Sequence, residues 1–231
     1  MNLLHVLAVL QTPYCERAGT GIFAEPLNAV SNLAFLITAV LAAGLIRRQG
    51  GMSRLTRALP WSIAEVALAS ALYHTLRGPL TFALDALSLL LFVVLALLIV
   101  LREIRLQTAA VGLITLVFIG LEAAALFLLP QQFLNGSTTY LLMLFLLLLL
   151  MGLIARVHRS LAGAMIPIAL LFGAAIFFRT VDGAVCPWFP LGTHFLWHLS
   201  AAAAAFFVIR FDVLLEGGRG SKGPAERSNG I

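Results

Sequence analysis

Two histidines, His194 and His198, stand four residues apart in the segment GTHFLWHLSAAAA, which begins an apolar run with no charged residue before Arg210. Residues at i and i+4 share one face of a helix, so both imidazoles can bind one metal ion. His74, in the segment SALYH, supplies a third nitrogen from elsewhere in the chain. Three protein ligands with one open position are typical of catalytic zinc. The pair alone would equally fit an amphipathic anchor at a membrane interface.

The composition indicates a membrane protein. The chain of 231 residues is 61% hydrophobic and 11% charged, which leaves few polar side chains to cover a soluble fold. Apolar runs of about 20 residues, enough for a helix to cross a bilayer, recur along the sequence. The net charge of +5 does not indicate a nucleic-acid partner, because there is no basic helix and no interleaving of aromatic residues with Lys or Arg. We expect an all-α seven-transmembrane helix bundle, with spans near 25–46, 59–76, 79–101, 108–129, 137–156, 161–178 and 193–211.

The positive charges predict the orientation of this bundle. Twelve Lys or Arg residues follow the first, third, fifth and seventh spans, whereas Arg17, Arg77 and Arg179 lie on the other side. Cytoplasmic loops carry the excess of Lys and Arg, so the N-terminus is predicted outside and the C-terminus in the cytoplasm. The chain then divides into an extracytoplasmic N-terminal segment (1–24), a seven-span domain (25–213) and a disordered cytoplasmic tail (214–231).

This topology places five polar residues at one depth in the outer leaflet. His74 ends the second span, with Ser70 one turn below it, Asp85 lies one to two turns into the third span, and both histidines of the last span lie in its first turns. Ionisable groups inside a membrane are costly and are therefore functional candidates. Zinc would lower the pKa of a bound water to near ~7 and polarise a carbonyl. Asp85 can then take the proton of that water, and Ser70 can donate to the developing oxyanion.

A polar stripe runs down the first span. Glu25, Asn28 and Asn32 stand at i, i+3 and i+7, with Ser31 beside them. The stripe fits a cation site, residues that support the zinc ligands from behind, or simple hydrogen bonding between helices.

The two cysteines lie on the predicted outer side, Cys15 before the first span and Cys186 before the last. An oxidising compartment would allow them to pair. Two unrelated free thiols are the alternative. Because both residues lie in short loops on one face, we predict a disulfide.

Four stretches together resemble the alkaline ceramidase family, part of a superfamily of seven-span membrane hydrolases that includes the progestin and adiponectin receptors. YCERAGTGIFAEPLNAVSNLAF is similar to the family's Trp-Cys-Glu segment followed by Ala-Glu-x-x-Asn-x-x-Ser-Asn. SALYH resembles its Ser-x-x-x-His, and HFLWH resembles its His-x-x-x-His in the seventh span. Asp85 falls where the family has an aspartate in the third span. The stretches cover most of the chain in order and spacing.

The resemblance implies a zinc-dependent amidase that cleaves the N-acyl bond of ceramide into a fatty acid and a sphingoid base. It implies that the three histidines, His74, His194 and His198, bind zinc. It also implies that Asp85 and Ser70 lie near the catalytic water.

The resemblance further implies calcium (Ca²⁺) in the N-terminal segment. Glu16 and Glu25 match two ligand positions, and Tyr14 matches a main-chain carbonyl position. Two other ligand positions, an aspartate and an asparagine in the family, are Pro13 and Ala18 here, and the segment between the two glutamates is shorter. A hard cation needs several oxygens, so the sequence leaves calcium open.

We therefore predict an integral membrane enzyme, a zinc-dependent (Zn²⁺) hydrolase of ceramide-like lipid amides with its active site toward the extracytoplasmic leaflet. The alternative is a seven-span lipid-binding receptor with a structural zinc, which would not need an open zinc position flanked by Asp85 and Ser70. A transporter is a third hypothesis, but it should show broken helices in paired halves, and the sequence has none.

Overall fold

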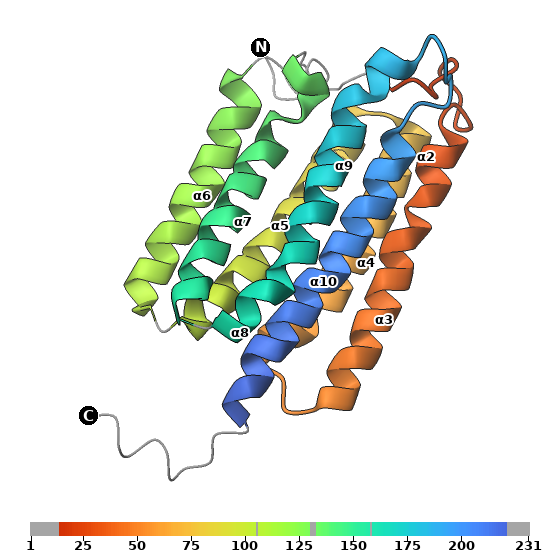
Figure 1. Ribbon diagram of the computed structural model, residues 1–231. Helices are drawn as coiled ribbons and strands as arrows, with labels where there is room; N and C mark the ends of the chain where they lie inside the picture. Colours follow the sequence, from red (N-terminus) through yellow and green to blue (C-terminus); the bar gives the residue numbers. More distant parts are fainter. Residues whose placement is uncertain (1–13, 105, 130–132, 158, 221–231) are drawn as a thin grey trace, which may run out of the picture.

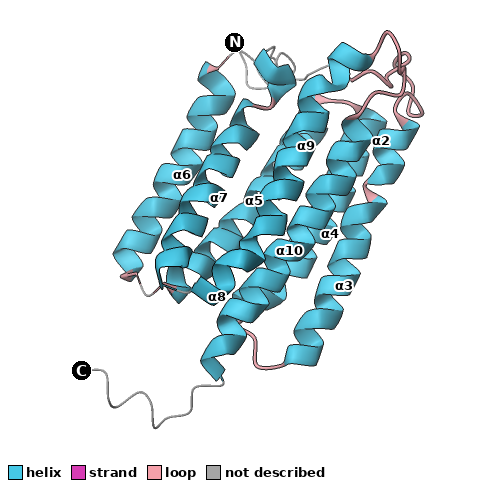
Figure 2. Ribbon diagram, viewed as in Figure 1, coloured by secondary structure: helices cyan, strands magenta, loops and turns pink. Residues whose placement is uncertain are grey.

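The chain folds into a bundle of α-helices (Figure 1). The computed structural model describes residues 14–104, 106–129, 133–157 and 159–220, and these ranges contain helices and no strand (Figure 2). The long helices are α3 (Leu33–Gln49), α4 (Arg54–Leu76), α5 (Pro79–Glu103), α6 (Thr108–Leu128), α7 (Thr138–Val157), α9 (Ile166–Val185) and α10 (His194–Gly220). The shorter segments are α2 (Pro26–Ser31), η1 (Phe133–Gly136), α8 (Arg159–Ala162) and η2 (Gly163–Met165). The predicted all-α class is confirmed.

The long helices run alternately up and down (Figure 1). The N-terminal segment and the α9–α10 loop lie at one end of the bundle, and the end of α10 lies at the other. α10 packs between α9 and α3, and α4 packs between α3 and α5. α6 lies next to α5, and α7 next to α9. Ala39, Ala42, Ala202 and Ala205 belong to the core between α3 and α10, where small side chains let helix backbones approach closely.

Within the described residues, six segments are long and apolar enough to cross a membrane: Pro26–Gln49, Pro79–Arg102, Thr108–Leu128, Thr138–Arg156, Gly163–Val185 and His194–Gly217. α4 is not among them, because Ser62, Glu65, Ser70 and His74 make it less apolar. Its 23 residues still extend about 34 Å at 1.5 Å per residue, which is enough to span a bilayer. The seventh crossing and the orientation of the termini stay predictions.

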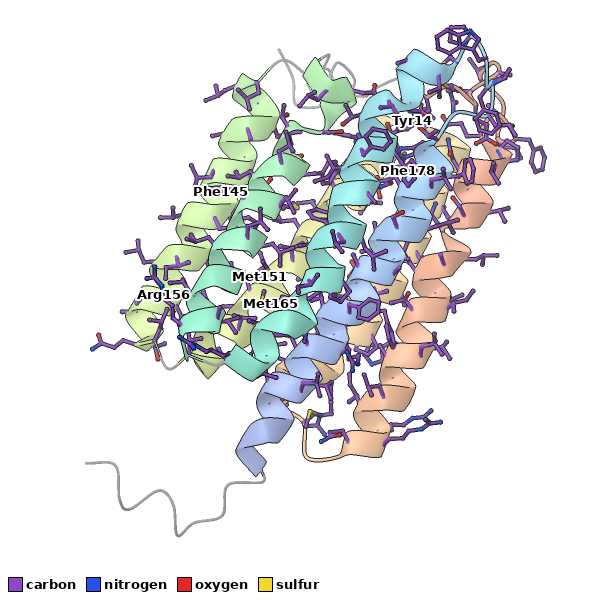
Figure 3. All side chains as sticks on the ribbon, in the orientation of Figure 1. Tyr14, Phe145, Met151, Arg156, Met165 and Phe178 are labelled. Atoms are coloured by element: carbon purple, nitrogen blue, oxygen red, sulfur yellow. A yellow bond between two sulfur atoms is a disulfide. The ribbon has the colours of Figure 1, made fainter. Side chains whose placement is uncertain are left out.

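Large apolar side chains cover the outside of the bundle. Val40 of α3, Leu116 of α6 and Phe145 of α7 are 65%, 69% and 66% exposed. Side chains project from the outer faces of the helices along most of their length (Figure 3). An exposed apolar surface of this extent is typical of a face that contacts lipid.

Several arginines lie at the end of the bundle away from Tyr14, whereas Arg17, Arg77 and Arg179 lie near Tyr14. Arg47 and Arg48 lie in the last turn of α3, Arg54 begins α4, and Arg156 lies in the last turn of α7. Figure 3 shows Tyr14 near one end of the bundle and Arg156 at the other. The alternation of charge predicted from the sequence therefore agrees with the alternation of the helices.

α9 is longer than predicted. It continues to Val185 instead of ending near residue 178, so Arg179 and Asp182 lie in its last turns and are buried. Arg179 was predicted as an outer loop residue. Arg179 is buried because its guanidinium donates a hydrogen bond inside the bundle and lies against aromatic rings, as described below.

α10 is also longer than predicted, and residues 214–220 are helical where a disordered tail was expected. Glu216 accepts hydrogen bonds from the Ser53 amide at 2.9 Å and from the Thr56 hydroxyl at 2.7 Å. This carboxylate thereby fixes the end of α10 to the start of α4. The rest of the predicted tail, 221–231, lies outside the described residues.

The structure joins Cys15 and Cys186 in a disulfide, with Cα atoms 5.3 Å apart. The bond connects the segment before α2 to the end of α9, across 171 residues of sequence. It holds the N-terminal segment at the end of the bundle where α10 begins.

We expect native protein that is alkylated without reduction to carry no label, because both thiols are in the bond. Intact mass before and after reduction measures this. The single variants Cys15→Ser and Cys186→Ser should each expose one thiol. They should also unfold more easily, since loss of a disulfide typically costs ~2–4 kcal/mol. Two labelled thiols in unreduced wild-type protein would contradict the pairing.

Candidate functional site

Three histidines meet inside the bundle. His74 lies in the last turn of α4, and His194 and His198 lie in the first turns of α10. They are 1%, 1% and 2% exposed. One nitrogen of each ring lies within 4.8 Å of the others, so the cluster could hold a metal ion. The structure thus brings together the three residues that the sequence pattern grouped.

The tautomer of His74 is fixed by a carboxylate. Its Nδ1 lies 2.5 Å from Oε2 of Glu25, which precedes α2 and is fully buried. An ionised carboxylate can only accept, so Nδ1 carries the proton and Nε2 keeps its lone pair. The unshared electrons of Nε2 are therefore available to a metal.

The tautomer of His198 follows from a hydroxyl. Nδ1 of His198 lies 2.7 Å from Oγ of Ser31, and that hydroxyl donates its single proton to the carbonyl of Asn28 at 2.8 Å. The Ser31 oxygen must then accept from the ring, so Nδ1 of His198 carries the proton. Nε2 of His198 is again the free nitrogen. A ligating histidine whose other nitrogen donates to an oxygen is the usual arrangement in metal sites.

His194 is positioned through its backbone. The amides of Thr193 and His194 donate to Oδ1 of Asp182 at 2.7 and 2.9 Å, which caps the start of α10. The Tyr14 ring stacks on the His194 ring with centroids 3.8 Å apart. The Nδ1 atom of His194 is buried without a hydrogen-bond partner.

Gly192 lets the α9–α10 loop approach Asp182. Its φ is 64°, a conformation that favours glycine. A Cβ at this position would overlap Asp182 Oδ1 and the Cys15 side chain. The same carboxylate also accepts the Cys15 amide at 3.0 Å, so it connects the N-terminal segment to the first turn of α10.

Asp85 and Ser70 lie beside the histidines. Asp85 is in the second turn of α5, next to Ser70 and within electrostatic reach of His74. Asp85, Ser70, His194 and His198 all line one cavity between α4, α5, α7, α9 and α10. The remaining wall of this cavity is mostly apolar. The five residues that the sequence grouped therefore lie together at one end of the bundle, and their roles stay predictions.

Arg179 was not predicted as part of the site, although it lines the same cavity. It donates to the Tyr14 hydroxyl at 3.0 Å, and its guanidinium lies 5.1 Å from the Tyr140 ring centroid and 5.7 Å from that of Trp197. These partners come from three separate segments of the chain. The sequence feature that could have indicated this role is the pair Arg179 and Asp182, which directly follows the apolar run of the sixth predicted span.

Glu25 also connects the cluster to the N-terminal segment. Its Oε1 accepts from Arg17 at 2.7 Å and from Arg77 at 3.2 Å, while Oε2 accepts from His74. Burial alone would raise the pKa of this carboxyl, but its hydrogen bond with His74 and the nearby guanidinium groups outweigh burial and lower the pKa. The carboxylate is therefore held in its ionised form.

The rest of the polar stripe is used for backbone contacts. Glu16 accepts the amides of Leu27 and Asn28 at 2.5 and 2.8 Å, which satisfies the free N–H groups at the start of α2. The Asn32 side chain donates to the Asn28 carbonyl at 2.8 Å. Of the three predicted supporting residues, Ser31 contacts His198 with its side chain and Asn28 contacts the same ring with its backbone. Asn32 acts on the cluster through its bond to Asn28.

The donor set suits a metal that accepts imidazole ligands. Nε2 is fixed as the free nitrogen on two of the rings, the cluster is buried, and it lies at the wall of a cavity that also presents a carboxyl and a hydroxyl. Neutral imidazoles favour zinc and related transition metals over calcium or magnesium. Three such ligands would leave a fourth position free on a tetrahedral ion, and Asp85 and Ser70 lie beside the cluster.

Two comparisons with known proteins bear on the family of this chain. A search of curated proteins gives no significant match, whereas the comparison with protein families does. The family model described as Ceramidase matches residues 11–226, which include the histidine cluster, Asp85, Ser70 and the N-terminal carboxylates. The chain belongs to the ceramidase family, whose activity is hydrolysis of the amide bond of ceramide.

Proposed function

We propose that this protein is a zinc-dependent intramembrane hydrolase that cleaves N-acyl sphingoid lipids into a fatty acid and a sphingoid base. The observation that carries the proposal is a cluster of three histidines, two of which line a mostly apolar cavity together with Asp85 and Ser70. His74, His194 and His198 would hold the metal. Bound there, zinc would supply a water acidified toward a pKa of ~7 and an electrophile for the amide carbonyl.

Asp85 has the position of the proton carrier. Water adds to the amide carbon and gives its proton to the carboxylate, which returns it to the leaving nitrogen as the C–N bond breaks. The products are a carboxylic acid and a free amine, so atoms and charge balance. Ser70 lies beside Asp85, where its hydroxyl can donate to the carbonyl oxygen as negative charge develops.

The shape of the interior suits a lipid with two chains. A second cavity lies between α5, α6 and α7, and it shares Asp85, Leu89, Tyr140, Met143 and Arg179 with the first. Asp85 and Arg179 lie near the histidine cluster, and the other walls of both cavities are mostly apolar, with Glu122 in the second. An amide held at the junction would leave one chain to each cavity. Such a substrate would enter sideways from the membrane, so a soluble short-chain amide should be a poor substrate even at high concentration.

The first prediction concerns the metal. Purified wild-type protein should contain one zinc ion per chain, and His194→Ala and His198→Ala should lose it because two nitrogens cannot retain a buried ion as three do. Metal analysis by mass spectrometry measures this. His158→Ala removes a histidine that the sequence places between the fifth and sixth predicted spans, and it serves as the control. Full occupancy in both cluster variants would refute the assignment.

The second prediction concerns the support of the ligands. Ser31→Ala removes the acceptor of the His198 Nδ1 proton and leaves the ligand atom in place. Loss of such a partner typically weakens metal binding about 10- to 100-fold. Competition with a zinc chelator measures the affinity. Ser62→Ala, whose hydroxyl donates to the Leu59 carbonyl within α4, is the matched control and should bind zinc like the wild type.

The third prediction concerns chemistry. Asp85→Asn should keep zinc but lower the rate of fatty acid release from a ceramide by ~10²–10⁴-fold, because it removes the proton acceptor. Ser70→Ala should lower the rate by no more than ~10²–10³-fold, the value for one oxyanion donor. The assay uses a panel of N-acyl lipids in mixed micelles. A wild-type rate in Asp85→Asn would favour instead the receptor with a structural zinc.

A further inference from the structure

Two arginine side chains neutralise the carboxylate of Glu25, the residue directly before α2. Arg17 and Arg77 both contact Oε1 of Glu25, and their side chains are 18% and 11% exposed. Arg17 reaches Glu25 from only eight residues before it in the chain. A buried carboxylate needs paired charge and hydrogen bonds, and here two guanidinium groups and an imidazole supply both.

From Tyr14 onward, where the structure describes this segment, few of the candidate ligand oxygens remain for a metal cation. The Tyr14 carbonyl accepts the Arg17 amide at 3.2 Å, both oxygens of Glu16 accept amides of α2, and both oxygens of Glu25 are hydrogen-bonded. The side-chain oxygens of Asn28 and Asn32 are buried and accept no hydrogen bond. They are neutral, and calcium takes about six to eight oxygens, usually with several carboxylates among them. The residues present therefore do not fit calcium.

The charge balance gives the same answer. Glu16 and Glu25 contribute two negative charges, and Arg17 and Arg77 contribute two positive charges. A divalent cation would add two uncompensated positive charges next to two guanidinium groups in a mostly buried site.

We propose that Arg17 is the resident cation of this site, that the site takes no calcium, and that Arg17 acts through Glu25 to hold His74 in position. Arg17 is thus a positioning residue, since it touches neither substrate nor metal. The positioning half rests on the proposed zinc site, whereas the calcium half does not.

The route from Arg17 to the cluster is short and buried. Arg17 binds one oxygen of Glu25, and the other oxygen of the same carboxylate accepts the Nδ1 proton of His74. The rigid carboxylate therefore transmits the position of the N-terminal segment to a metal ligand. Without Arg17, Oε1 of Glu25 would keep only its longer contact with Arg77, and the carboxylate would hold the His74 ring less firmly.

Arg77 assists from the other side. Its guanidinium lies 4.9 Å from the Tyr14 ring centroid and 4.8 Å from that of Tyr73, and its backbone has φ 45°, a left-handed conformation that is unfavourable for a residue with a side chain. Such a conformation persists where the surroundings hold it. The Nη1 atom of Arg77 lies 3.2 Å from Oε1 of Glu25, and that of Arg17 lies 2.7 Å from it. Arg17 is therefore the closer partner.

The calcium half is tested on wild-type protein. Zinc-loaded protein in detergent micelles is treated with a calcium-selective chelator, and its thermal unfolding is then followed during titration with calcium chloride up to millimolar concentration. We expect no shift in the unfolding midpoint, and no binding of radioactive calcium above that of a micelle blank. Calcium-dependent stabilisation or stoichiometric calcium binding would overturn the proposal.

The positioning half is tested with three variants. Arg17→Ala should weaken zinc binding about tenfold in competition with a chelator, the lower end of the range for residues that support a ligand. Arg17→Lys keeps a positive charge near Glu25 and should recover most of this loss. Arg48→Ala, an exposed arginine in the last turn of α3 at the opposite end of the bundle, is the control and should match the wild type.

Arg17→Ala with wild-type zinc affinity would refute the positioning role. If that variant does not fold, Arg17→Gln replaces it, and its zinc affinity compared with that of Arg17→Lys decides the same question. A wild-type protein without zinc would instead refute the proposed function, and the calcium titration would still be valid because it measures stability and binding only.

Discussion

The site depends on one constraint: inside an apolar bundle, every imidazole nitrogen that carries a proton needs an oxygen to accept it. For His74 that oxygen belongs to Glu25, and for His198 it belongs to Ser31. Both acceptors come from the stretch around α2, so the orientation of two rings on α4 and α10 is set by a short helix that contributes no ring itself. The position of α2 in turn requires Glu16, whose carboxylate satisfies its first amides. The geometry of the histidine cluster therefore depends on how firmly the segment around α2 is held in place.

The N-terminal segment is held in place by several independent contacts. The disulfide fixes Cys15 to the end of α9, and Asp182 binds the Cys15 amide while capping α10. Tyr14 lies between His194, on which its ring stacks, and Arg179, which donates to its hydroxyl. Each contact joins this segment to an element that carries a residue of the site. The covalent bond and the polar contacts thus act together to close one end of the bundle above the histidines.

Much of this arrangement could be predicted from the sequence because it follows from periodicity and charge. The lengths of the apolar runs predict the spans, and the positions of the arginines predict how the spans alternate across the membrane. Together they predict that His74, Asp85 and His194 lie at a common depth. The extent of α9 could not be predicted this way. A polar pair such as Arg179 and Asp182 normally marks a loop, and only tertiary partners from distant segments, among them Tyr14 and the amide of Thr193, keep it helical and buried. The role of Glu25 was similarly beyond local pattern, since its partner His74 lies 49 residues away.

The polar end and the apolar length of the bundle together determine how a lipid amide can be held. Most polar groups that line the first cavity lie around the histidines, Asp85 and Arg179. The walls toward the other end carry residues such as Phe92, Leu97 and Val100, with Asp212 as the polar exception. An amide placed among the apolar walls would leave its N–H and C=O unsatisfied, and hydrocarbon placed at the polar end would leave charged groups without partners. The lowest free energy has the amide beside the histidines and the chains along the walls. The distribution of polarity therefore orients such a lipid with its amide at the site before any contact specific to its head group is made.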